Sequence, residues 1–320
     1  MLRSADCRLP AHERIRGHAR VATLVSASIL FVLSLVAAPT PARAALPGSN
    51  GDIAFTRNNR IWIARPDGQQ VNLGAGHHPA YSPDGTRIAF VRYPGRRRAH
   101  IWTMAADGTD RTAVTAGQHW DSAPSWSPDG SRIVFSRGGS GRPADVYTVS
   151  VTTSFNEPVA VTSTLGNEFD TEWSPDGTRI AFGVSICGAA CDLHIGVVDV
   201  DGRNYTLLTP DGAVDVDPNW SPDSSTLLFA SDRQGGSGDY DIFTIPAIGG
   251  APTRITAASG AAAHREPIWS PDGTRISYVR QSAGGAVTIR TANPDGSSRT
   301  RVCRGDVLFY PTTTDWQPIT

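Results

Sequence analysis

One five-residue phrase recurs along this chain and constrains its fold more than any other feature. An aromatic residue followed by Ser-Pro-Asp-Gly, or a close variant, occurs five times, with the aromatic at Tyr81, Trp126, Trp173, Trp220 and Trp269. The steps between them are 45, 47, 47 and 49 residues, and a further 47 residues leads to Trp316. A regular period of roughly 40 to 50 residues indicates a repeat architecture.

Each repeat carries the signals of four short strands. The Pro-Asp-Gly turn is followed by an alternating strand such as 179–182, a polar loop, and a second strand such as 101–104. An Asp-Gly turn, as at 107–108, then leads to a last strand ending in Thr115. Four strands in about 47 residues is the size of one propeller blade. The sequence therefore predicts an all-β fold, a six-bladed β-propeller with four antiparallel strands per blade.

The two ends of the chain complement each other. Residues 51–55 match the strand that follows the Pro-Asp-Gly turn, so the first unit lacks its innermost strand, while 313–316 resemble an innermost strand with nothing after it. Pairing them would remove the exposed edges that an open ring leaves. We expect the ring to close by pairing of the N- and C-terminal segments in one blade.

The first 44 residues differ from the rest. Five arginines precede an uncharged run at 21–38, and Pro39, Pro41 and the triplet Ala-Arg-Ala follow, which is the plan of a secretory signal. We expect residues 1–44 to be a signal peptide and 45–320 to form one propeller domain in the periplasm, in the cell envelope or outside the cell. The alternative is an uncleaved anchor, since the run just reaches membrane-spanning length.

Composition limits the partners. The chain has no lysine, and its 29 basic residues face 30 acidic ones. Removing residues 1–44 leaves 23 arginines against 28 acids. A mildly acidic domain is a poor nucleic-acid binder, so we expect an envelope or extracellular protein or peptide as the partner of a monomer that has no membrane span in its mature chain.

Three cysteines follow the predicted signal peptide. Cys187 and Cys191 could close a small disulfide loop in an oxidising compartment, which would leave Cys303 as an odd thiol. A metal site is the alternative, although no His or second Cys pair lies at zinc-like spacing. We expect the disulfide.

The repeated residues themselves favour a structural interpretation. Proline presets the turn, Asp can bond backbone N–H groups and Gly accepts a positive φ. The preceding aromatic, at Tyr81, Trp126, Trp173, Trp220, Trp269 and Trp316, presents a large apolar surface to the neighbouring blade. The unit at 223–224 has Ser in place of Gly, so we expect a different turn there.

The phrase Trp-Ser-Pro-Asp-Gly-Thr-Arg-Ile-Ala-Phe, complete at 173–182, resembles the repeat of the TolB-type β-propellers, and the match covers about 51–318. The resemblance implies a six-bladed propeller that serves as a protein-docking platform. Similar repeats occur in propeller domains of prolyl oligopeptidase and dipeptidyl peptidase relatives. Those enzymes need a hydrolase domain with a G-x-S-x-G elbow, which this chain lacks. TolB carries a further domain ahead of its propeller, for which 45–50 leaves no room, so we do not expect a part in a Tol-Pal system.

Two positions of each repeat supply candidate site residues near the channel mouth. Counted from the aromatic, the third residue before it is His78, Asp170, Asp217 or Glu266 in four repeats, and the fifth is Asp121, Glu168, Asp215 or His264 in four repeats. Trp120, outside the repeated phrase, is the candidate for an exposed recognition aromatic. We expect these nine residues to form a partner-binding mouth.

Several kinds of chemistry fit such a mouth. Asp170, Asp217 and Glu266 could hold a hard cation such as Ca²⁺, or the mouth could receive a basic side chain of a partner. The groups could also cap loop N–H groups or stand in water. The function predicted is an exported, non-catalytic binding or scaffold protein, and the alternative is a carbohydrate-active or other small-substrate lyase or hydrolase using the acidic mouth.

Overall fold

The structure is a computed structural model that describes residues 49–95, 98–139, 141–151, 157–187, 191–210, 212–234, 238–257, 262–305 and 314–319. The predicted signal peptide at 1–44 lies outside these ranges. Over the described part all regular elements are strands, and none is a helix long and apolar enough to cross a membrane.

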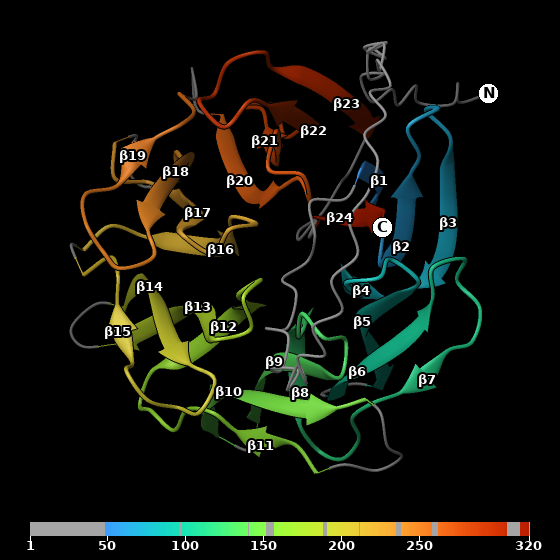
Figure 1. Cartoon of the computed structure of the whole chain (residues 1–320), viewed down its shortest axis with the longest axis vertical. Helices are drawn as coiled ribbons and strands as arrows, with labels where there is room; N and C mark the ends of the chain where they lie inside the picture. The colour runs from blue at the N-terminus through green and yellow to red at the C-terminus, as the bar shows by residue number, and fades with distance from the viewer. Residues whose placement is uncertain are drawn as a thin grey trace, which may run out of the picture.

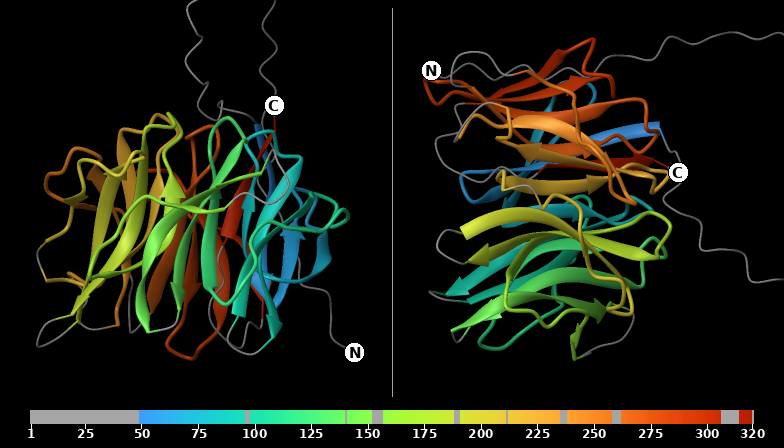
Figure 2. Two further views of the ribbon diagram at one scale, coloured as in Figure 1. Left: turned by 90° about the horizontal axis from the view of Figure 1, so that it is seen from below. Right: turned by 90° about the vertical axis from the view of Figure 1, so that its left-hand side faces the viewer.

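The strands form sheets that stand around a central axis, so the fold is an all-β propeller (Figure 1). Seen from the side, the strands run through the thickness of a disc (Figure 2). The described residues contain four sheets of four strands and one of eight. In the first four-stranded sheet the order is β24 (Thr314–Ile319), β1 (Ser49–Arg57), β2 (Arg60–Ala64) and β3 (Gln70–Ala75). The second consists of β12 (Asn167–Trp173), β13 (Arg179–Cys187), β14 (Cys191–Asp199) and β15 (Thr206–Leu207), and the third of β16 (Asp215–Trp220), β17 (Thr226–Ser231), β18 (Asp241–Pro246) and β19 (Thr253–Arg254). The fourth consists of β20 (Ala263–Trp269), β21 (Ile276–Gln281), β22 (Val287–Ala292) and β23 (Thr300–Gly305).

The eight-stranded sheet consists of two antiparallel sets of four strands. Its strands are β4 (His77–Tyr81), β5 (Arg87–Gly95), β6 (Arg98–Ala105), β7 (Thr112–Ala113), β8 (Trp120–Trp126), β9 (Arg132–Gly139), β10 (Arg142–Ser150) and β11 (Val159–Ala160). One parallel residue pair, Ala99 with Trp120, joins β6 to β8. Whether this sheet is one blade or two decides the blade count, so six blades stays a prediction.

The ends of the described chain meet in one sheet. Strand β24 pairs antiparallel with β1, and Trp316 lies opposite Ile53. This is the pairing that the sequence predicts for the two end segments. Because β24 lies innermost (Figure 1), the last described residues contribute to the wall of the central channel.

The repeated turn is held by its own side chains. The Ser174 hydroxyl donates to Asp176 at 2.6 Å and accepts from the Arg179 N–H at 2.9 Å, and Asp176 accepts from the Thr178 N–H at 2.9 Å. The same contacts recur in the turns after the other aromatics from Tyr81 to Trp269. The phrase thus encodes one turn geometry.

The prediction of a different turn at 223–224 is wrong. Ser224 takes a φ of 59°, close to the 75° of Gly177, and its N–H donates to the Ser221 carbonyl at 2.8 Å as in the glycine turns. A left-handed backbone is costly for a side-chain-bearing residue. Here the Ser224 hydroxyl accepts from the Asp176 N–H at 2.9 Å, a contact that glycine cannot make, and this offsets part of that cost.

The repeat aromatics fill the space between neighbouring sheets. Five of them are more than nine-tenths buried, namely Tyr81, Trp126, Trp173, Trp220 and Trp316, and Trp269 is partly buried. The Trp126 indole N–H donates to the Ala80 carbonyl at 3.1 Å, and that of Trp220 donates to the Glu172 carbonyl at 3.3 Å. Each bond crosses from one innermost strand to the innermost strand before it.

Candidate functional site

Every innermost strand from β4 to β20 carries the same irregularity. The residue three before the aromatic has a positive φ, between 48° and 57°, and the register with the second strand shifts there: the residues are His78, Ala123, Asp170, Asp217 and Glu266. In β4, for example, His77 pairs with Val91 but Ala80 pairs with Ala89, so one extra residue stands on β4. Such a bulge re-aims a side chain.

The innermost strands enclose a cavity of about 240 Å³ on the propeller axis. Four of the predicted residues line it: His78, Asp170, Asp217 and Glu266. Glu172 and Asp315, each one residue before a repeat aromatic, line it as well. Five carboxyl groups and one imidazole therefore face one cavity, and its described lining contains no arginine.

Asp170 and Asp217 are adjacent in this cavity, and both carboxyl groups have raised pKa values. Burial raises the pKa of Asp170, and the charge of Asp217 and a hydrogen bond to it raise it further. Burial also raises the pKa of Asp217, although the Glu266 N–H, which donates to its Oδ2 at 3.0 Å, and Arg265 oppose the rise. The arrangement favours one proton held between two carboxylates.

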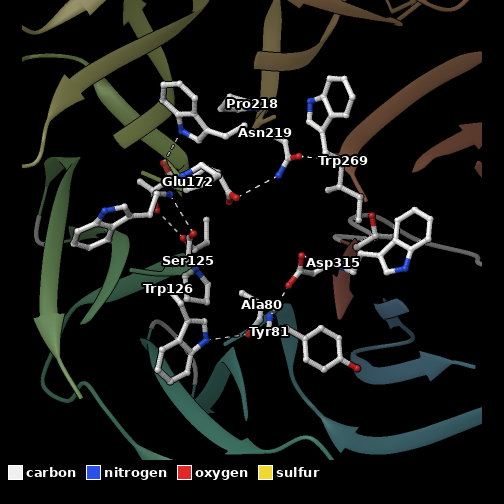
Figure 3. Close-up of a pocket in the computed structure, with 18 of the residues that line it drawn as sticks. Ala80, Tyr81, Ser125, Trp126, Glu172, Pro218, Asn219, Trp269 and Asp315 are labelled. Carbon is white, nitrogen blue, oxygen red and sulfur yellow. Dashed lines mark hydrogen bonds between the residues drawn. The ribbon is translucent and has the colours of Figure 1, made fainter. Parts of the chain in front are cut away.

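A second layer lies one residue before each aromatic (Figure 3). Ser125 Oγ accepts from the Trp173 N–H at 3.1 Å, Asn219 Oδ1 from the Trp269 N–H at 2.8 Å, and Asp315 Oδ2 from the Tyr81 N–H at 2.5 Å. Asn219 Nδ2 also donates to Glu172 Oε1 at 3.3 Å. These side chains tie β8 to β12, β12 to β16, β16 to β20 and β24 to β4 around the channel.

Two carboxyl groups of this layer have strongly raised pKa values. Burial and the charge of Asp315 raise the pKa of Glu172 to about 8, although a Ser125 hydrogen bond opposes the rise. Burial raises the pKa of Asp315 to about 7, against the N–H groups of Tyr81 and Trp316 that lower it. Both groups thus ionise near neutral pH.

His78 is the basic side chain of the described lining, and it is uncharged at neutral pH. Burial lowers its pKa to about 4, and the neighbouring His77 lowers it further. Its Nδ1 is buried with no hydrogen-bond partner among the described residues. The negative charge of the channel is therefore not balanced by this histidine.

The residues five before the aromatic do not face the channel, contrary to the prediction. The extra residue of the bulge shifts the alternation of the strand, and these side chains enter the seams between sheets, where they are buried. Arg137 bonds Asp121 twice, at 2.7 and 2.9 Å, and Arg233 bonds Asp215 at 2.9 Å. The charges of Asp121 and Asp215 are therefore paired with arginines inside the fold.

The other two such residues contact the preceding sheet. Glu168 accepts from the Val146 N–H at 3.1 Å and from the Thr162 hydroxyl. His264 Nδ1 lies 2.9 Å from Thr256 Oγ1 and 3.2 Å from Asp241 Oδ1. The predicted partner-binding set is thus divided between channel and seams.

The predicted calcium site is not formed in the described part of the chain. Asp170 and Asp217 are adjacent, and Glu266 reaches Asp217 through its backbone N–H. No group of three or more His, Cys, Asp or Glu among the described residues lies close enough to hold a metal ion.

Two remaining predictions concern residues outside the cavity lining, Trp120 and the cysteine pair of the β13–β14 hairpin. Trp120 is 44% exposed at the start of β8 and lies outside the cavity lining. Cys187 lies opposite Cys191 at the end of the β13–β14 hairpin, and Cys187 is disulfide-bonded.

The residues of the second layer were missed by counting three and five places back from the aromatic. Ser125, Glu172, Asn219 and Asp315 directly precede the repeat aromatics, so the repeat itself carried the signal. Their type varies between repeats, although Ser125, Asn219 and Asp315 all accept a backbone N–H from the next innermost strand and Glu172 accepts the Asn219 side-chain amide.

An all-β propeller with an acidic central channel is the class that the fold and the site define. The chain belongs to the TolB β-propeller domain family, whose model matches residues 144–314. No curated protein matches the sequence at a significant level.

Solved structures share the fold at low identity. TolB from Acinetobacter baumannii aligns with a TM-score of 0.70 and 21% identity over 84% of this chain and 67% of that chain. A putative TolB from Agrobacterium tumefaciens gives 0.61 and 20% over 85% and 100%. An oligogalacturonate lyase in complex with manganese gives 0.55 and 16% over 80% and 74%. At these identities the likeness concerns the fold.

Proposed function

We propose that this chain is an exported, non-catalytic docking protein whose acidic channel receives a positively charged side chain of a protein or peptide partner. The observation that carries the proposal is the set of five carboxyl groups, Asp170, Glu172, Asp217, Glu266 and Asp315, facing one cavity with no arginine in its described lining. Neighbouring TolB structures support a propeller platform for such docking.

Electrostatics favours a cationic ligand. Burial raises the pKa values of Glu172 and Asp315, and repulsion by the charge of Asp315 raises that of Glu172 further, so ionised carboxyl groups are costly in this partly dry cavity. A guanidinium or ammonium group would relieve this repulsion through charge-assisted hydrogen bonds. A neutral side chain of the same shape would gain none of that energy.

We propose that the docking protein is a six-bladed propeller formed by one domain, residues 45–320. The two antiparallel sets in the eight-stranded sheet each have four strands and meet in one residue pair, Ala99 with Trp120. Counting each set as a blade gives six units, one for each repeat aromatic. The secretory pattern of residues 1–44 supports export to the periplasm, envelope or exterior, which N-terminal sequencing of the protein recovered from cell fractions would test.

The docking proposal is tested with a matched pair of probes, L-argininamide and L-citrullinamide, which differ in the charge of the side chain. We expect the full-length protein to bind argininamide at pH 8 at least about tenfold more tightly than citrullinamide. The double substitution Asp170→Asn with Asp217→Asn should abolish the preference.

The control is Asp201→Asn, an exposed carboxylate in the turn after β14, which should change nothing. Proteins retained from the cell envelope by the wild type and lost by the double variant would then be candidate partners. Equal binding of both probes by the wild type would contradict the proposal.

A further inference from the structure

Two aromatic side chains lie exposed and in contact at the seam between β5 and β8. The Trp120 indole is 44% exposed and the Tyr93 phenol 39% exposed. Their ring centroids are 5.4 Å apart with a 48° tilt, and Tyr93 meets the edge of the His77 imidazole at 4.9 Å. We call these three side chains the Trp120 platform.

The repeats themselves show that the fold does not require this platform. Trp120 stands six residues before its repeat aromatic, where four other repeats have Ala75, Asn167, Val214 and Ala263 and the last has Tyr310. Tyr93 stands twelve residues after its aromatic, where other repeats have Gly138, Ser185, Asp232 and Gln281. Most repeats therefore carry no aromatic at either position, and the pair of Tyr93 with Trp120 is an addition to the common blade.

The platform is rigidly placed. His77, Tyr93 and Trp120 belong to β4, β5 and β8, and the backbone of Trp120 pairs with Ala99 of β6. The Ala99 N–H also bonds the His119 carbonyl at 3.4 Å. Side chains held on strands lose little conformational entropy when a ligand binds.

One cationic side chain and one histidine flank the paired residues. Arg98 and His119, which directly precede Ala99 and Trp120, are both exposed. Both act on His100, whose pKa is lowered chiefly by burial and further by Arg137, Arg98 and His119. The Asp121 carboxylate, 4.0 Å from the His100 ring, is buried and bonded twice by Arg137, so it does not offset the charge at the surface.

The size of the platform fits one ring better than a protein. A stable protein interface buries about 800 Å² on each partner. The other exposed large apolar side chains of the described chain are Val159, on the outermost strand β11 of the set that begins with β8, and Leu165, Ile186, Tyr205 and Ile248, which follow that set in the chain. A sugar ring has a flat apolar C–H face that suits an exposed indole, and hydroxyl groups at its edge that suit polar neighbours.

We propose that the Trp120 platform binds an anionic carbohydrate, with a pyranose ring stacked on Trp120 and its carboxylate paired with Arg98. The site is separate from the acidic channel, which would repel such a ligand. Through this site an exported docking protein would bind acidic polysaccharide.

Two probes with the same β-1,4-linked skeleton test the proposal: oligoglucuronate and cello-oligosaccharide of equal length, titrated into the full-length protein by calorimetry. We expect the wild type to prefer the uronate. Trp120→Ala should weaken uronate binding at least about tenfold, Trp120→Phe should weaken it less, and Arg98→Gln should remove the preference over the neutral probe.

The matched control is Ile186→Ala, which truncates a side chain that is 43% exposed on another hairpin. It should leave binding unchanged, as should the channel substitution Asp217→Asn, and all variants should stay folded, with the melting temperature of Trp120→Ala within about 4 °C of the wild type. No uronate binding by the wild type, unchanged binding by a folded Trp120→Ala protein, or tighter binding of a poly-glutamate peptide than of the uronate would each overturn the proposal.

Discussion

The carboxylate of Asp315 accepts a hydrogen bond from the backbone N–H of Tyr81 at 2.5 Å, although 234 positions separate the two residues. Ser125 and Asn219 make the same contact with Trp173 and Trp269 of the following repeats. The seam between β24 and β4 is thus built from the same contact as two of the internal seams.

Asp315→Ala should therefore weaken the closing seam. The substitution leaves the Tyr81 N–H without its acceptor, which costs about 1 to 3 kcal/mol. Urea unfolding at pH 5.5, where ionisation of the channel is limited, measures the loss. Asp315→Asn keeps an acceptor oxygen and should retain most of the stability. Equal midpoints for Asp315→Ala and the wild type would contradict the importance of this contact.

Deleting residues 311–320 should have a larger effect, because it removes β24 and leaves β1 as an open edge. We expect a marked drop in melting temperature and a tendency to aggregate through that edge. An unchanged melting temperature would contradict the closure of the ring by the end segments.

Stability should fall as pH rises toward 8. Folding raises the pKa of Glu172 to about 8 and that of Asp315 to about 7, so the folded protein binds more protons than the unfolded chain. Their stabilising effect is full below about pH 4 and is lost as pH rises through these values, with a combined loss on the order of 5 kcal/mol or more. Urea titrations from pH 5 to 8 measure it. Glu172→Gln should show a smaller fall, and an identical slope would refute the assignment.

The sequence predicted the repeats well because each turn is held within its own phrase, as Ser174 and Asp176 show. It misplaced Asp121, Glu168, Asp215 and His264 for a physical reason. Strict alternation puts positions one, three and five before the aromatic on one face, but the bulge adds a residue that only a backbone reveals. The repeat pattern could have indicated the second layer, and it could not have given the positive φ at Asp170.

Two tryptophans provide a matched comparison of burial. Trp173 is 7% exposed and packs in a cluster with Val134, Ile180 and Phe182, so Trp173→Ala should cost about 3 to 5 kcal/mol. Trp120→Ala removes the same side chain from an exposed position and should cost about 1 kcal/mol or less. Thermal unfolding of the two variants measures the difference. Similar losses would mean that the repeat aromatics do not carry the contacts between sheets.

Binding of argininamide in the channel should release protons. The raised pKa values of Asp170 and Asp217 favour a proton shared between them, and a guanidinium that enters between the two carboxyl groups should displace it, since the cation stabilises their ionised forms. Affinity should rise about tenfold between pH 5.5 and pH 8, and calorimetry in two buffers of different ionisation enthalpy should report proton release at pH 6. Asp217→Asn should reduce both effects, whereas Asp201→Asn should preserve them. Affinity that does not change with pH would show that the ligand does not meet the shared proton, and the cation would then have to bind elsewhere on the propeller.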